Sequence, residues 1–130
     1  MEERKKILIV DDDAEVRQIL ADKLIAEGFD VIQAVDGETG LQSADAARPD
    51  LILLDLIMPK IDGVGVMTKL RENEWGKNEP IIIITNIDPD ENTVRAMAKC
   101  KPYYFFSKGM FDLDDLVNKI KEILPPLIIH

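Results

Sequence analysis

The sequence predicts an α/β protein with one sheet of five parallel strands and helices on both faces of that sheet. Five short apolar runs alternate along the chain with segments in which apolar residues recur every three or four positions, the spacing of an amphipathic helix. The runs 51–54 and 81–84 are aliphatic at every position, as strands buried on both faces are. Because parallel strands need crossover connections, this alternation gives a doubly wound (βα)5 sandwich of three layers.

The first half of the chain contains three expected strands and two expected helices. The strands are the runs 7–10, 30–34 and 51–54. The first helix carries its apolar residues at helical spacing, with Asp13 as its expected N-cap and Gly28 as its end. A shorter helix begins after the turn Asp36-Gly37 and is stopped by Arg48-Pro49.

The second half contains two further strands and three helices. The strands are the runs 81–84 and 103–106. One helix follows Gly63, and the last helix has a continuous apolar stripe between 113 and 124. Between them, Asp88 is expected to be an N-cap, with Pro89 as the first helical residue and Glu91 as the third.

Length and composition limit the class of protein. A chain of 130 residues suits one domain with a buried core, which we expect to span 1–124, with 125–130 as a short tail and no output domain. The net charge of −9 argues against a nucleic-acid partner, and every apolar run is far shorter than the roughly 20 residues of a membrane helix. The single cysteine, Cys100, excludes an internal disulfide and fits a reducing cytoplasm.

Charged or hydroxyl side chains follow four of the five expected strands. Asp11 and Asp12 follow the first strand, Asp55 follows the third, Thr85 closes the fourth, and Lys108 follows the fifth. In a parallel sheet the carboxyl ends of the strands lie at one edge, where ligands bind beside the reversal of strand order. We therefore expect these side chains to meet in one site.

The chemistry of such a site follows from its charges. Three neighbouring carboxylates repel one another, so at least one is protonated unless a cation neutralises them. Oxygen ligands suit Mg²⁺ or Mn²⁺, and a metal ion with a lysine can stabilise charge on phosphoryl oxygens. Because carboxylates form aspartyl phosphates, the pattern predicts phosphoryl transfer to Asp55 rather than metal storage.

These motifs resemble those of response-regulator receiver domains over essentially the whole chain. The run 7–13 resembles the family's first strand with its acidic pair, and 53–63 resembles the segment around the phosphorylated aspartate. Thr85 after four isoleucines matches the switch threonine, and Lys108 matches the essential lysine. The resemblance implies a CheY-like, flavodoxin-like fold.

The resemblance also implies a role for each residue of the site. Asp55 would accept a phosphoryl group from a sensor histidine kinase or a phosphotransfer protein, in a reaction that needs Mg²⁺. Asp12, Asp55 and the backbone carbonyl of Ile57 would bind the Mg²⁺, and Asp11 would contact it mainly through water. Lys108 and Thr85 would complete the catalytic residues, and the Thr85 hydroxyl would donate to a phosphoryl oxygen.

Phosphorylation would act through a switch made of Thr85 and the aromatic Phe105. The switch would alter the face formed by the fourth helix, fifth strand and fifth helix, which would bind a downstream protein partner. The resemblance thus implies a cytoplasmic signalling domain, a monomer or a phosphorylation-dependent dimer, that catalyses only its own phosphorylation and dephosphorylation and is otherwise no enzyme. We expect neither direct nucleic-acid binding nor a membrane partner.

The chain departs from the family pattern at three places. Asn86 replaces the small residue that usually follows the switch threonine, and Gly109 replaces the proline that usually follows the lysine. Lys101-Pro102 replaces the usual Gly-Ala turn before the fifth strand. These changes remove no group that the chemistry needs, but they bear on the shape of the fourth-helix face and on the cis peptide common after the lysine.

Three alternative functions share parts of this pattern. A haloacid-dehalogenase-like phosphohydrolase also uses an aspartyl phosphate but needs an acid/base aspartate two residues later, where this chain has Ile57. A pseudo-receiver would be a constitutive interaction module, and loss of an acidic residue, the acceptor or the lysine would favour it. A flavodoxin-like nucleotide binder would need a glycine-rich phosphate loop, and the sequence has none.

Overall fold

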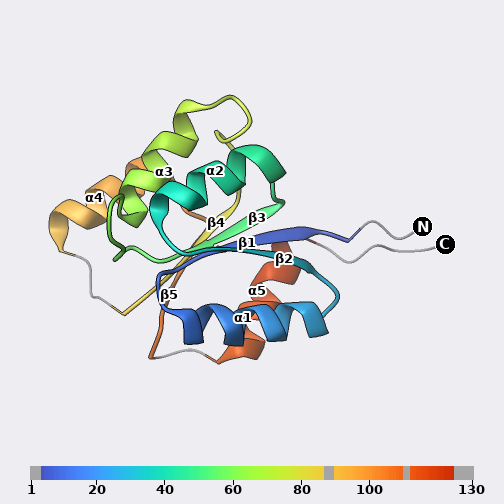
Figure 1. The fold of residues 1–130 in the computed structure, drawn as a ribbon. Helices are drawn as coiled ribbons and strands as arrows, with labels where there is room; N and C mark the ends of the chain where they lie inside the picture. The colour runs from blue at the N-terminus through green and yellow to red at the C-terminus, as the bar shows by residue number, and fades with distance from the viewer. Residues whose placement is uncertain (1–3, 87–89, 110–111, 125–130) are drawn as a thin grey trace.

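The computed structural model describes residues 4–86, 90–109 and 112–124, and it confirms the predicted α/β sandwich. Five parallel strands form one sheet in the order β2-β1-β3-β4-β5 (Figure 1). In chain order the elements are β1 (Lys6–Val10), α1 (Ala14–Ala26), β2 (Asp30–Ala34), α2 (Gly37–Ala47), β3 (Leu51–Leu54), α3 (Gly63–Glu72), β4 (Ile81–Thr85), α4 (Glu91–Cys100), β5 (Tyr104–Ser107) and α5 (Leu113–Ile123).

The order of the strands reverses between β1 and β3. From β1 the chain goes outward to β2, then returns to pair β3 with the other side of β1, in register Val10 with Leu54. A doubly wound sheet has its crevice at this reversal, above the carboxyl ends of the strands. The residues that follow Val10 and Leu54 therefore face each other across that crevice.

Two hydrophobic cores lie on the two faces of the sheet. Figure 1 shows α2, α3 and α4 covering one face and α1 and α5 covering the other. Alternate residues of each strand go to opposite cores: Leu8 and Leu54 pack with α2 and α3, whereas Ile9 and Leu53 pack with α1 and α5. The all-aliphatic strands predicted from the sequence are therefore buried on both faces, and they hold the strand ends rigidly.

An aspartate caps each helix, and one of the predicted caps is wrong. The carboxylate of Asp13 accepts hydrogen bonds from the backbone N–H groups of Glu15 and Val16, as expected. Helix α4, however, is capped by Asp90, whose carboxylate accepts the N–H of Thr93. The predicted cap, Asp88, lies outside the described residues. Both acids precede the same helix, so the residue pattern alone did not distinguish them.

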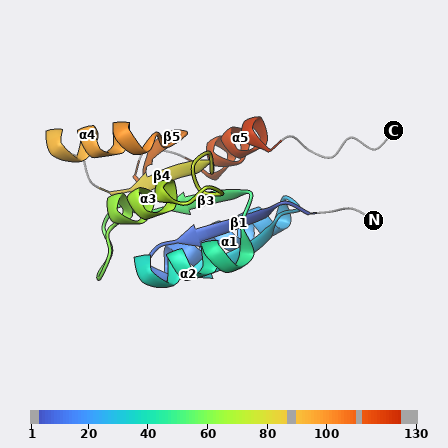
Figure 2. The same ribbon diagram turned by 90° about the horizontal axis from the view of Figure 1, so that it is seen from above.

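The departures near β5 bring one left-handed residue and no cis peptide bond among the described residues. Figure 2 shows α4, β5 and α5 together at one edge of the sheet. Lys101 is the C-cap of α4 in a left-handed conformation with φ of 53°, and within the described residues every peptide bond, including Lys108–Gly109, is trans. Among the residues that the structure describes, no helix combines the length and the apolar character needed to cross a membrane.

Candidate functional site

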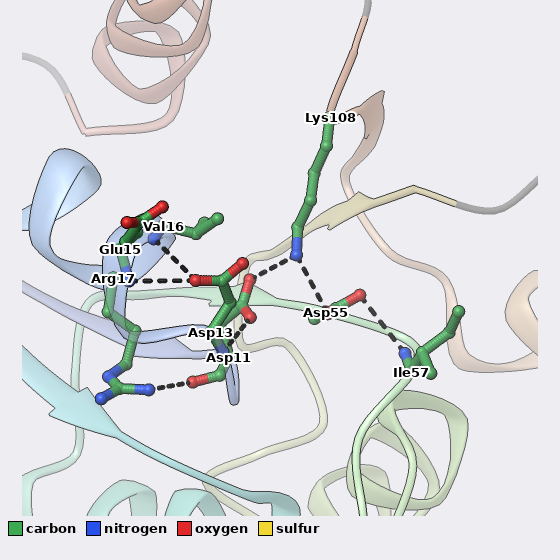
Figure 3. A network of polar contacts seen from close by, with 8 residues as sticks. All are labelled: Asp11, Asp13, Glu15, Val16, Arg17, Asp55, Ile57 and Lys108. Atoms are coloured by element: carbon green, nitrogen blue, oxygen red, sulfur yellow. Dashed lines mark hydrogen bonds and ion pairs between the residues drawn. The ribbon is translucent and has the colours of Figure 1, made fainter.

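The acidic residues and the lysine predicted from the sequence meet at the carboxyl edge of the sheet. Asp11 follows β1, Asp55 follows β3, and Lys108 follows β5. Lys108 extends from its strand end to lie between the two carboxylates (Figure 3), with Nζ 2.8 Å from Oδ2 of Asp11 and 3.1 Å from Oδ2 of Asp55. One cation thus bridges two acids that are 44 positions apart in the sequence.

Asp12 completes a cluster of three carboxylates. Asp11, Asp12 and Asp55 each offer an oxygen, and these oxygens lie within 4.8 Å of one another. Asp11 and Asp55 are only 3% and 5% exposed, whereas Asp12 is exposed to solvent. An all-oxygen set of this kind, closed at its base and open toward water, fits a hard divalent cation that keeps part of its hydration shell.

The two charged groups at the centre of the site have shifted pKa values. Burial raises the pKa of Asp11, against the opposing effects of the Lys108 ammonium and the backbone N–H of Asp13. Burial also lowers the pKa of Lys108, but its hydrogen bonds and ion pairs with Asp11 and Asp55 outweigh this, and the net shift is upward. The site therefore holds a lysine that stays protonated and an acid that is poorly solvated.

The loop after β3 fixes the orientation of Asp55. The backbone N–H of Asp55 donates to the carbonyl of Val10 at 3.0 Å, and the N–H of Ile57 donates to Oδ1 of Asp55 at 3.3 Å (Figure 3). Gly63 packs so closely beneath this loop that a Cβ there would collide with the Asp55 carbonyl. The carboxylate is consequently bound on one oxygen by the loop and on the other by Lys108.

Thr85 is linked to the cluster through the backbone of Lys108, and Phe105 lies on the neighbouring strand. The backbone carbonyl of Thr85 accepts the N–H of Lys108 at 2.9 Å. Its side chain is fully buried, and its hydroxyl has no hydrogen-bond partner among the described residues. Phe105 is half-buried against the core shared by α3 and α4, and it pairs in the sheet with Ile83, two residues before Thr85.

The sequence analysis missed Arg17, which supports the acidic pair from α1. Its Nη1 donates to the backbone carbonyl of Asp11 at 2.8 Å (Figure 3), while Oδ1 of Asp11 accepts the N–H of Asp13 at 2.9 Å. Both contacts fix the segment that carries Asp11 and Asp12. The available signal was a cation four residues after the helix cap, one turn from the cluster.

Comparison with known proteins identifies the family. The sequence model of the family described as "Response regulator receiver domain" matches residues 7–121. The chain is 45% identical over 122 residues to the protein described as "Probable transcriptional regulator ycf27" of Porphyridium aerugineum, and this match covers 94% of the chain and 49% of that protein. It is 32% identical over 119 residues to the DNA-binding dual master transcriptional regulator RpaA of Synechocystis, covering 92% of the chain and 48% of RpaA.

Solved structures agree with this assignment. The chemotaxis protein CheY4 of Vibrio cholerae superposes with a TM-score of 0.84 at 26% identity, covering 93% of this chain and 99% of that one. The chain belongs to the response regulator receiver domain family, a family of signalling domains rather than of conventional enzymes. The predicted family and fold are confirmed.

The relatives also correct one prediction. We expected no nucleic-acid binding from the net charge of −9, but RpaA is a DNA-binding regulator and contains a segment homologous to this chain. That expectation is wrong, because the chain spans about half the length of the curated relatives it matches. The charge of a receiver segment does not exclude DNA binding by a longer protein, such as RpaA, that contains a homologous segment.

Proposed function

We propose that this domain accepts a phosphoryl group on Asp55 from the phosphohistidine of a sensor histidine kinase or a phosphotransfer protein. The observation that carries the proposal is the placement of the Asp55 carboxylate. It is 5% exposed, it is oriented by the N–H of Ile57, and it lies 3.1 Å from Lys108. A carboxylate fixed beside a cation in this way is a suitable nucleophile for phosphoryl transfer.

In the proposed reaction a carboxylate oxygen of Asp55 forms a bond to phosphorus as the bond from phosphorus to the donor nitrogen breaks. The imidazole leaves and takes up a proton from solvent. Lys108 remains protonated because Asp11 and Asp55 raise its pKa, so it can move its hydrogen bond from a carboxylate to a phosphoryl oxygen. Such fixed charges stabilise the transition state without reorganisation.

The residues of the acidic cluster fit Mg²⁺, with Mn²⁺ as a substitute. We propose that Asp12, Asp55 and the backbone carbonyl of Ile57 hold the ion and that Asp11 contacts it through water. When bound, the ion neutralises charge on the phosphoryl oxygens and on the carboxylates. Support comes from the oxygen-only donor set and from the solvent exposure of Asp12, which leaves room for water ligands.

The switch is proposed to depend on the unpaired hydroxyl of Thr85. A buried hydroxyl without a partner costs free energy. A phosphoryl group on Asp55 would provide an acceptor for this hydroxyl, so movement of Thr85 toward Asp55 would be favourable. Phe105 lies on the neighbouring strand and can follow into the space that Thr85 vacates, which would alter the surface of α4, β5 and α5 for a downstream partner. In a protein organised like RpaA, the process controlled by this surface would be DNA binding. A cytoplasmic location stays a prediction.

The test is labelling by acetyl phosphate, followed by intact mass spectrometry. Wild type should gain one phosphoryl group only when Mg²⁺ is present, Asp55→Asn should gain none, and Asp12→Ala should need more Mg²⁺ for the same labelling. Equal labelling of wild type and Asp55→Asn would overturn the proposal. A wild type that binds Mg²⁺ but is never labelled would instead favour the pseudo-receiver.

A further inference from the structure

The loop from Asp55 to Asp62 contains a residue with an unusual backbone. Lys60 has a φ of +69°, in the left-handed region that residues other than glycine seldom adopt. Two other non-glycine residues in the described chain share this conformation, and both are C-caps of helices, where it is common: Arg48 and Lys101. Lys60 caps no helix and lies in the loop between β3 and α3.

Lys60 also forms ion pairs with residues at the start of α2. The ammonium of Lys60 lies 3.4 Å from Oδ2 of Asp36 and 3.6 Å from Oε2 of Glu38. Asp36 is itself fixed, because its Oδ1 accepts the N–H of Thr39 at 2.8 Å and the hydroxyl of Thr39 at 2.9 Å in a capping box. The two carboxylate oxygens of Asp36 thus hold two different elements, the helix and the loop.

A second contact joins the same two segments one residue further on. Gly37, the first residue of α2, lies so close to the backbone carbonyl of Ile61 that a Cβ would collide with it. The N-terminus of α2 is therefore seated against the loop at both Lys60 and Ile61. Lys60 is three residues from Ile57, whose backbone N–H orients Asp55 and whose backbone carbonyl belongs to the proposed metal site.

We propose that Lys60 is a positioning residue, which ties the β3–α3 loop to the N-terminus of α2 and so sets the place of the Ile57 backbone for cation binding. This inference rests on the proposed function, because it assumes a divalent cation at the acidic cluster. An exposed ion pair usually contributes little to stability, and Lys60 is 59% exposed. Its effect should therefore be seen in cation affinity rather than in the free energy of unfolding.

The direction of the change in cation affinity distinguishes a positioning role of Lys60 from a purely electrostatic one. Replacing Lys60 by a neutral residue removes a positive charge from an already acidic protein, and the electrostatic field alone would then strengthen cation binding. Loss of a positioning contact should weaken cation binding instead, since residues that orient metal ligands commonly affect affinity about tenfold or more. For an exposed tether we expect a weakening of about three- to tenfold.

The experiment measures Mg²⁺ affinity by calorimetry, with Mn²⁺ and electron paramagnetic resonance as a second readout. Lys60→Met removes the charge and keeps the length, and Lys60→Arg keeps the ion pair. Lys77→Met is the matched control. Lys77 is also exposed and forms an ion pair, with Glu74 at 2.9 Å, but it precedes the amino end of β4, whereas the acidic cluster lies at the carboxyl ends of the strands. Lys60→Met should bind more weakly, while Lys60→Arg and Lys77→Met should stay within about twofold of wild type.

Labelling by acetyl phosphate gives a kinetic readout. In Lys60→Met the Mg²⁺ concentration for half-maximal labelling should rise by the same factor as the dissociation constant, while the rate at saturating Mg²⁺ should return to that of wild type. Unchanged or tighter Mg²⁺ binding by Lys60→Met, or an equal loss in Lys77→Met, would overturn the inference. A wild type that binds no Mg²⁺ would overturn the proposed function itself.

Discussion

Replacing Lys108 by methionine should destabilise the protein in the absence of divalent cations. The Lys108 side chain is 13% exposed and pairs with carboxylates that are 4% and 6% exposed, at 2.8 Å and 3.1 Å. Methionine keeps most of the side-chain volume but removes the charge. The variant therefore has two buried carboxylates, Asp11 and Asp55, without their cation.

The expected magnitude follows from the burial of these groups. Removing one partner from a buried ion pair costs about 3–5 kcal/mol, and protonation of Asp11, whose pKa is already raised by burial, offsets part of this cost. We therefore expect a loss of about 2–3 kcal/mol at pH 7. An acid whose pKa is higher in the folded state contributes stability at low pH and loses it as the pH rises, so the deficit of the variant should shrink toward pH 5.

Mg²⁺ should reverse this deficit. Lys108 lies against two carboxylates of the proposed cation site, so we expect its removal to tighten Mg²⁺ binding, and a ligand at 100 times its dissociation constant stabilises the folded state by about 2.7 kcal/mol. The assay is urea denaturation of wild type and Lys108→Met at pH 5 and pH 7, with EDTA or with Mg²⁺. Lys121→Met is the control, because Lys121 forms an exposed ion pair with Glu27.

Two results would refute this reasoning. If Lys108→Met and wild type had the same free energy of unfolding in EDTA at pH 7, the bridge between Asp11 and Asp55 would have no energetic importance. If Mg²⁺ stabilised the variant less than wild type, Lys108 would not compete with the cation.

Three further predictions concern other parts of the molecule. Burial, with a smaller effect from Asp50, raises the pKa of Glu79 to about 7, so the contribution of Glu79 to stability should fall as the pH rises from about 4.5 to about 7. Glu79→Gln should reduce this slope and stabilise the protein at pH 8 by up to about 3 kcal/mol, measured by urea denaturation. Ile57 is 51% exposed beside Asp55, and neither it nor Ile87, which lies outside the described residues, can orient water; Ile57→Asn with Ile87→Glu should speed phosphoryl decay about tenfold, equivalent to about 1.4 kcal/mol, and unchanged decay would contradict this. Phe105 has no hydroxyl to satisfy when it turns inward, so Phe105→Tyr should lower the partner affinity of the unphosphorylated protein, and equal affinity in a binding titration would count against it.

The sequence allowed the fold to be predicted because its strands are chemically distinct. The aliphatic runs at 51–54 and 81–84 suit only strands that are covered on both faces, and both are fully buried in the central part of the sheet. The parallel topology then gathers the residues after Val10, Leu54 and Ser107 at one edge. That is why Asp11, Asp55 and Lys108 could be placed together although they are far apart in the chain.

Contacts between loops could not be predicted in this way. The tether from Lys60 to Asp36 depends on a left-handed backbone and on the close approach of Gly37, neither of which leaves a periodic pattern in the sequence. The choice between Asp88 and Asp90 as helix cap depends on where the chain enters α4. The DNA-binding relatives could not be inferred either, because the charge of this domain carries no information about the rest of their chains.

The most direct test of the account is to identify the modified residue chemically. The protein is incubated with acetyl phosphate and Mg²⁺, then treated with borohydride, which reduces an aspartyl phosphate to homoserine, and its peptides are sequenced by mass spectrometry. The account predicts homoserine at position 55 in wild type with Mg²⁺, and none without Mg²⁺ or in Asp55→Asn. Homoserine at Asp11 or Asp12, or unreduced aspartate at position 55 in a protein that has gained a phosphoryl group, would contradict it.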